Sequence, residues 1–282
     1  MGANPLELPI SDSPALRIFL DSFRITLDES PLRSLARVTA AFARLPYENL
    51  TKILKLSEAG NLAEARRVPL EVFQDHFELG TGGTCFSLTA ALLHLVRALG
   101  WHAEPLLADR RYGPDTHCAL VVWIDGHPHL LDPGYLLVRP VPLPAAGEIR
   151  IPTSFNEVVL VARNSGEKID LYTVHQGQKT YRLTFKSQPA ESAAFLRAWD
   201  ASFAWDMMNY PVVARIANGR QFYLQQNRWL VRSQTNSERR ELNPQRLAEH
   251  IAHEFGIAPA VAVRALAVLQ RKGEGRGCDS AA

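Results

Sequence analysis

Hydrophobic residues recur at three- and four-residue steps along much of the first hundred residues. Residues 32–45 place leucine, valine and phenylalanine on one face of a helix, and Pro46 ends the pattern. Ser30 and Pro31 mark the start, because serine favours the N-cap position and proline has no N–H to lose at the first helical position. Two similar stretches follow, at residues 70–77 and 86–99. The pattern predicts a helical N-terminal region.

After Gly100 the apolar residues gather in short runs that are typical of strands. Residues 117–124 and 129–132 flank Asp125-Gly126, a dipeptide that strongly favours a tight hairpin. Further strand-like runs lie at residues 157–163, 168–174 and 180–186, and around turns at 218–219 and 226–227. Helix-like patterns return at residues 190–203 and 244–272.

The order of these elements predicts an α+β protein. We expect a helical bundle over residues 1–100, an antiparallel β-barrel or strongly curved sheet over 101–189, and a smaller α/β unit over 190–272. The glycine-rich end, residues 273–282, is expected to form a disordered tail.

Composition and charge narrow the classes of protein. The chain has 282 residues, of which 46% are hydrophobic, enough for a sizeable core. Its 31 lysines and arginines nearly balance 29 acids, for a net charge of +2, so we expect no nucleic-acid partner. The arginine pairs at 66–67, 110–111 and 239–240 are interpreted as solvated surface.

No segment has the pattern of a targeting or membrane-spanning sequence. The first residues lack the basic start and apolar run of a signal peptide, and no apolar stretch approaches the roughly 18 residues of a membrane span. The cysteines, Cys85, Cys118 and Cys278, are odd in number. We therefore expect a reduced, cytoplasmic protein with no membrane partner.

Cys85 stands at the first turn of a predicted helix, directly behind Gly82 and Gly83. A helix N-terminus carries unpaired N–H groups and about half a positive charge, which stabilises a thiolate and an oxyanion. The glycines allow a sharp turn and a close approach of substrate to the backbone. The alternative is a small buried side chain that happens to lie early in a helix.

The predicted hairpin brings an imidazole and a carboxylate together. With a two-residue loop, Ile124 faces His127 and His117 faces Gly134, so Asp132 lies one diagonal step from His117 on the same face. We expect the carboxylate to hold Nδ1–H and leave Nε2 free to accept a thiol proton. Separately, the two residues could be a polar strand end and a turn residue. Together with the cysteine they predict a Cys-His-Asp triad.

A metal site is not expected. Cys118 adjoins His117, but neighbouring strand residues point to opposite faces, so Cys118 is assigned to the core. His127 and His129 can share a face, yet two ligands are too few for structural zinc.

Several motifs together resemble the arylamine N-acetyltransferases. They are RLPYENL (44–50), TGGTCF (81–86), THCALVVWIDG (116–126), DPGY (132–135), ANGRQFYLQQNRWLVR (217–232) and HEFGI (253–257). The resemblance covers about residues 15–272. It implies a cysteine-protease-like arrangement of helical bundle, β-barrel and α/β lid, with Cys85, His117 and Asp132 as the triad. In that family the cysteine takes acetyl from acetyl-CoA and passes it to an arylamine or hydrazine nitrogen.

The chain departs from the family pattern beside the triad. Thr81 replaces the motif arginine, which usually pairs with the glutamate that is Glu48 here, so Glu48 must find another partner. Ser87 replaces an acidic residue, and Pro133 replaces valine. Substrate contacts are expected from Phe86, Gly134, Tyr135 and Leu137.

These features predict ping-pong transfer of an acyl group to an amine. No permanently bound cofactor is expected, and the co-substrate would be an acyl-CoA or a carrier-protein thioester. An amide-forming cyclase or thioester hydrolase with the same triad is an alternative, and a binding module without turnover is another. The sequence leaves the acyl length, the acceptor and the oligomeric state open.

Overall fold

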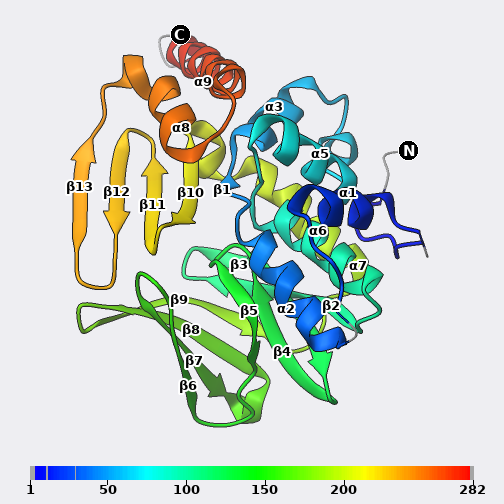
Figure 1. Cartoon of the computed structure of the whole chain (residues 1–282). Helices are drawn as coiled ribbons and strands as arrows, with labels where there is room; N and C mark the ends of the chain where they lie inside the picture. The colour runs from blue at the N-terminus through cyan, green and yellow to red at the C-terminus, as the bar shows by residue number, and fades with distance from the viewer. Residues whose placement is uncertain (1–3, 11, 29, 280–282) are drawn as a thin grey trace.

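The computed structural model describes residues 4–10, 12–28 and 30–279, and its N-terminal part is helical (Figure 1). Ser30 occupies the N-cap of its second helix and Pro31 the first helical position, as predicted. The helices of this part are α1 (Pro14–Phe23), α2 (Pro31–Phe42), α3 (Leu50–Glu58), α4 (Leu62–Ala65), α5 (Pro69–Leu79) and α6 (Cys85–Ala98).

Helix α6 is the centre of the main hydrophobic core. Its apolar residues surround the helix rather than following one stripe, which is the pattern of a buried helix. Phe86, Leu88 and Leu95 are each at most 1% exposed. The helix that carries Cys85 is therefore held by packing on every side.

A large curled antiparallel sheet follows the helices (Figure 1). Its strand order is β5-β4-β3-β2-β9-β8-β7-β6, with β5 and β6 at the edges. The bounds are β2 (Ala103–Arg110), β3 (Gly113–Ile124), β4 (His127–Asp132), β5 (Leu137–Pro142), β6 (Glu148–Pro152), β7 (Glu157–Arg163), β8 (Lys168–His175) and β9 (Gln178–Lys186). The predicted α+β class and curved sheet are confirmed, although the sequence patterns did not indicate β2, β5 and β6.

Strand β3 separates two cores because its side chains alternate between faces. Cys118, Leu120 and Val122 join the helical core, whereas Ala119 and Val121 face the core inside the curled sheet. A strand buried on both sides has no polar alternation, which explains its continuous apolar run in the sequence.

The β3–β4 hairpin has the predicted register. Asp125 and Gly126 both have positive φ, at 50° and 77°, as a tight two-residue turn requires. Ile124 pairs with His127, and Leu120 pairs with Leu131.

A second sheet has the order β1-β10-β11-β12-β13. Strand β1 (Tyr47–Glu48) comes from the helical region and pairs with β10 through Tyr47–Ala214 and Glu48–Val213. The remaining bounds are β10 (Val212–Ala217), β11 (Arg220–Gln225), β12 (Arg228–Arg232) and β13 (Ser237–Glu241). The two-residue strand β1 was not predicted, because it is too short to show any periodicity.

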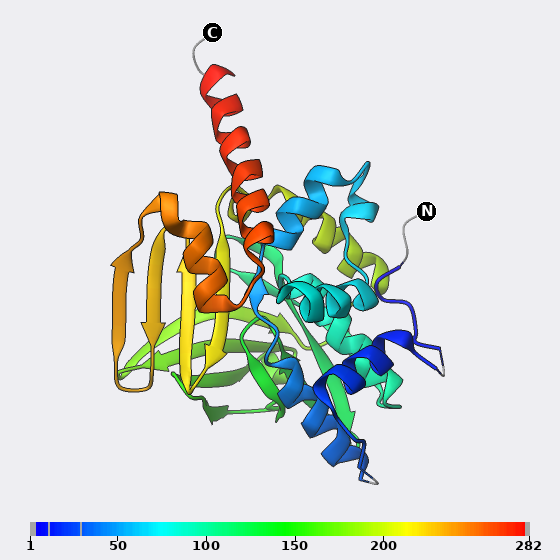
Figure 2. The ribbon, with the colours of Figure 1, turned by 45° about the horizontal axis from the view of Figure 1, so that its top comes forward.

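Three helices complete the C-terminal part: α7 (Ser192–Ala201), α8 (Leu247–Phe255) and α9 (Pro259–Asp279). Figure 2 shows the end of α9 projecting away from the rest of the molecule. The helix was predicted to end at Lys272 but continues to Asp279, because extending an existing helix costs far less than starting one. Residues 280–282 of the predicted tail lie outside the described residues. Within the described part, no helix is both long and apolar enough to cross a membrane.

Candidate active site

Gly82 and Gly83 bring the loop before α6 against strand β1. A Cβ on Gly82 would lie 1.8 Å from the carbonyl oxygen of Pro46, so only glycine permits this contact. The carbonyl of Gly83 accepts a hydrogen bond from the Glu48 N–H at 2.9 Å. The close approach that we expected from a substrate is made at Gly82 by the protein's own backbone.

Cys85 is the first residue of α6 and is 2% exposed. Thr84 occupies the N-cap without a side-chain hydrogen bond to the helix. The N–H groups of the first turn, which have no intrahelical partner, therefore remain available beside the sulfur.

His117 and Asp132 form a buried pair. His117 Nε2 lies 2.8 Å from Asp132 Oδ2, and the side chains are 1% and 0% exposed. The second carboxylate oxygen, Oδ1, accepts the Tyr135 N–H at 3.0 Å. The carboxylate is thus held from both sides.

The imidazole is oriented opposite to the prediction. Its Nε2 meets the carboxylate, while Nδ1 lies 3.2 Å from Nη2 of Arg110. Nε2 lies farther from the backbone than Nδ1, so it is the nitrogen that can reach Asp132 at its diagonal position on the neighbouring strand. Nδ1 is consequently the nitrogen left for the thiol.

The three side chains meet around Gly134. A Cβ at this glycine would lie 2.7 Å from His117 Cε1, 3.2 Å from Asp132 Oδ1 and 3.3 Å from Cys85 Cβ. One point in space is therefore within contact distance of the sulfur-bearing side chain, the imidazole and the carboxylate.

The surroundings of the sulfur favour a thiolate and an imidazolium. The pKa of Cys85 lies well below its usual value because Cys118 and His117 hydrogen-bond the sulfur and His117 and Arg110 add positive charge, against the opposing effect of burial. Burial acts to lower the pKa of His117, but the charge and hydrogen bond of Asp132 raise it above the usual value. A proton held by His117 and a charge held by Cys85 are both stabilised.

Cys118 lies in the core, as predicted. It is fully buried on the helix-facing side of β3, and its sulfur lies 3.6 Å from Thr89 Oγ1. Among the described residues, no group of three or more His, Cys, Asp or Glu side chains is arranged to hold a metal ion.

A cavity of about 860 Å³ is lined by Gly134, the residue around which Cys85, His117 and Asp132 meet. Tyr135 lines it as well, and whether Gly134 and Tyr135 contact substrate stays a prediction. Phe86 instead packs on Phe195 and Trp199, with ring centroids 5.2 and 5.9 Å away, and Leu137 is buried in the core of the curled sheet. Apolar residues next to a predicted site are often core residues, and these two are not among those lining the cavity.

Aromatic and basic side chains shape the cavity, and of these the sequence analysis predicted only Tyr135. The tyrosines are Tyr47, Tyr112, Tyr135, Tyr210 and Tyr223, and the arginines are Arg110, Arg182 and Arg232. Arg110 was interpreted as solvated surface together with Arg111. Arg110 is the last residue of β2 and lines the cavity, whereas Arg111 lies in the following turn and is exposed, so the prediction was wrong for one member of the pair.

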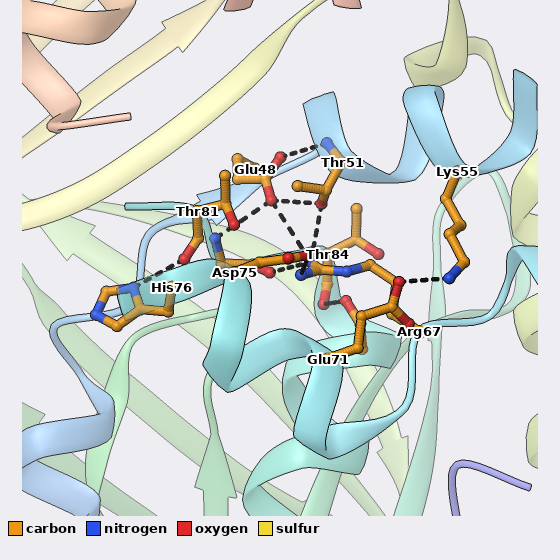
Figure 3. A network of polar contacts seen from close by, with 11 residues as sticks. Glu48, Thr51, Lys55, Arg67, Glu71, Asp75, His76, Thr81 and Thr84 are labelled. Atoms are coloured by element: carbon orange, nitrogen blue, oxygen red, sulfur yellow. Dashed lines mark hydrogen bonds and ion pairs between the residues drawn. The ribbon is translucent and has the colours of Figure 1, made fainter. Parts of the chain in front are cut away.

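In place of the motif arginine, Glu48 is paired with Arg67 (Figure 3). The side chains of Glu48 and Arg67 are 0% and 3% exposed, and Arg67 Nη1 lies 4.0 Å from Glu48 Oε1. Glu48 also accepts the Thr51 hydroxyl at 2.6 Å and the Gly82 N–H at 3.3 Å. The interpretation of the 66–67 pair as solvated surface was therefore wrong, because Arg67 is buried and Arg66, 15% exposed, pairs with Asp200.

Arg67 reaches this position from the segment between α4 and α5. Its Nη1 donates to the Gly82 carbonyl and to Thr51 Oγ1, and its Nη2 pairs with Asp75 at 2.7 Å (Figure 3). Thr81, which stands where the family motif has arginine, is completely buried, and its hydroxyl has no hydrogen-bond partner among the described residues. The positive charge beside the motif is thus supplied from a different part of the chain.

Solved structures with this fold are arylamine N-acetyltransferases. The enzyme from Mycobacterium abscessus is 19% identical with a TM-score of 0.75, over 91% of this chain and 96% of that one. The Mycobacterium marinum enzyme in complex with CoA is 17% identical with a TM-score of 0.72, over 91% and 98%. A Bacillus cereus enzyme described with a Cys-His-Glu triad is 14% identical with a TM-score of 0.70, over 88% and 100%.

Sequence comparison agrees with the fold. No curated protein matches the chain. The family model for N-acetyltransferases, however, matches residues 31–262, which include both predicted catalytic segments and most of the C-terminal part. The chain therefore belongs to the arylamine N-acetyltransferase family.

Proposed function

We propose that this protein transfers an acyl group from acyl-CoA to an amine through an acyl-enzyme on Cys85. The observation that carries the proposal is the meeting of Cys85, His117 and Asp132 around Gly134, beside a cavity large enough for a small molecule. Membership of the family favours acetyl as the acyl group and an arylamine as the acceptor.

In the first half-reaction, His117 Nδ1 takes the proton from Cys85 Sγ, and the thiolate attacks the thioester carbonyl. The N–H groups at the start of α6 are placed to stabilise the oxyanion that forms. The carbon–sulfur bond to CoA then breaks, and the departing thiolate takes the proton from His117. Asp132 keeps the ring oriented and stabilises its charged state.

In the second half-reaction, the amine enters the same cavity and attacks the acyl carbon. His117 removes a proton from the nitrogen, and the Cys85 thiolate leaves as the amide forms. Five tyrosine rings in the cavity wall offer an aromatic amine flat apolar surface. The donor assignment to CoA draws support from the CoA complex of the M. marinum relative.

The test is acylation followed by intact-mass measurement. The protein is incubated with acetyl-CoA, and the adduct mass and its removal by an arylamine are recorded. We expect one acetyl group on the protein, none on Cys85→Ala, and one again on Cys278→Ala, which removes a cysteine but keeps Cys85 and Cys118. An acetyl adduct on Cys85→Ala would overturn the proposal.

A further inference from the structure

Arg110 places a guanidinium at the inner end of the cavity, next to the triad. Its Nη2 lies 3.2 Å from His117 Nδ1, and its Nη1 donates to the Tyr112 hydroxyl at 2.6 Å. The guanidinium carbon is 5.9 Å from the ring centroids of both Tyr112 and Tyr135. Its Nε is buried and has no hydrogen-bond partner among the described residues.

The positive charge in the cavity is not balanced by the protein. Arg182 and Arg232 also line the cavity, and within the described chain none of the three guanidinium groups has an Asp or Glu oxygen within 4.0 Å. Asp206 is the one acid among the described lining residues. Nε of Arg232 is buried without a partner as well. Enclosed guanidinium groups without an acid partner favour an anionic ligand.

We propose that the substrates of this enzyme carry a carboxylate that Arg110 binds beside the reacting thioester. The proposal rests on acyl transfer through Cys85. The phosphates of CoA cannot supply this anion, because the long pantetheine arm separates them from the sulfur. The carboxylate therefore belongs either to the transferred acyl group or to the acceptor amine, since both occupy the cavity next to Cys85.

The experiment compares matched charged and neutral substrates in two arms. In the donor arm, Cys85 loading is followed in single turnovers with succinyl-CoA and with pentanoyl-CoA, its uncharged counterpart of similar length. In the acceptor arm, enzyme and acetyl-CoA are combined with 4-aminobenzoate or 4-aminobenzamide. Both arms are run on the wild type, on Arg110→Met and on Arg111→Met, which removes a neighbouring charge that faces solvent.

We expect the wild type to prefer the carboxylate in one arm, which identifies its source. Arg110→Met should lower the ratio of kcat/KM for that substrate to kcat/KM for its neutral counterpart about tenfold to a hundredfold, because a hydrogen-bonded ion pair is lost. Arg111→Met should not change this ratio. Equal rates for charged and neutral substrates in both arms, or equal losses in Arg110→Met, would overturn the inference. Failure of Cys85 to load with acetyl-CoA would instead refute the proposed function.

Discussion

Arg67 Nη1 lies 2.5 Å from the carbonyl oxygen of Gly82, three residues before Cys85. The same side chain contacts Thr51 and Asp75, so one guanidinium ties α3 and α5 to the loop that leads into α6 (Figure 3). Because Arg67 is 3% exposed, these contacts are made away from water. We therefore expect Arg67 to position Cys85 through the loop rather than through the sulfur itself.

Replacing Arg67 by Met should destabilise the protein and slow the reaction of Cys85. The substitution leaves Glu48 buried without a positive partner, and breaking a buried pair in this way costs about 3–5 kcal/mol. Unfolding by urea and the rate of Cys85 alkylation by iodoacetamide measure the two effects. Arg66→Met is the matched control, because Arg66 pairs with Asp200 on the other side of the segment. Similar results for both variants would contradict the positioning role of Arg67.

Sequence patterns predicted contacts between residues that are close in the chain and missed contacts between distant segments. Periodicity and turn chemistry predicted the start of α2 and the register of the β3–β4 hairpin, because both depend on residues close in the chain. The contact of His117 with Asp132 followed from that register. The cysteine is brought to this pair by α6, whose placement depends on the packing of two cores. The residue types and the helix start predicted that the three belong together, but no local pattern predicted the distance between Cys85 and the hairpin.

Residues that line the cavity from distant segments carried no sequence signal. Tyr47, Arg110 and Tyr223 come from three different strands, and their shared position depends on how the two sheets face each other. The predicted orientation of the His117 ring was wrong for a related reason. The register of the hairpin determines that His117 meets Asp132, whereas the ring nitrogen that contacts the carboxylate depends on the distance between the two strands.

A methyl group at Gly134 should disable the site without unfolding the protein. The Cβ of alanine would lie 2.7 Å from His117 Cε1, so the imidazole must move away from Cys85. We expect kcat of Gly134→Ala to fall at least about a hundredfold while the melting temperature changes little. Gly60→Ala is the control, because its Cβ meets only the flexible carboxylate of Glu64 at 3.2 Å. An active Gly134→Ala enzyme would show that the ring does not need its present position.

Asp132 should determine the pH at which the Cys85 thiolate becomes protonated. The carboxylate raises the pKa of His117 and so favours the pair of thiolate and imidazolium in which the pKa of Cys85 is lowered. Alkylation of the wild type should therefore stay fast through neutral pH and decline only in acid. In Asp132→Asn the imidazolium loses its partner, so the decline should move to higher pH by about one to three units. Rate constants measured from pH 5 to 9 test this, with Asp206→Asn as a control on the cavity wall. Coincident profiles for wild type and Asp132→Asn would count against the triad.

Lys52 should make the stability of the protein rise with pH. Burial lowers the pKa of this lysine from 10.5 to about 7, against the opposing charges of Cys85 and Cys118. Its ammonium donates to the Ser202 carbonyl at 3.0 Å and lies 4.5 Å from the Phe203 ring centroid, with 5% of the residue exposed. Between these two pKa values the unfolded chain holds a proton that the folded chain lacks, so the free energy of unfolding increases with pH.

Replacement of Lys52 by Met should remove this pH dependence. Both states of the wild type are protonated at pH 6, whereas at pH 9 only the unfolded state is, which adds on the order of 2 kcal/mol to the wild-type free energy of unfolding. In urea denaturation, the free energy of unfolding of the wild type minus that of Lys52→Met should increase by that amount from pH 6 to pH 9. Lys55→Met, which loses a partly exposed pair with Glu71, should show no such growth. If the Lys52→Met difference is the same at both pH values, the buried ammonium keeps its proton and its hydrogen bonds to Ser202 compensate fully for the loss of water.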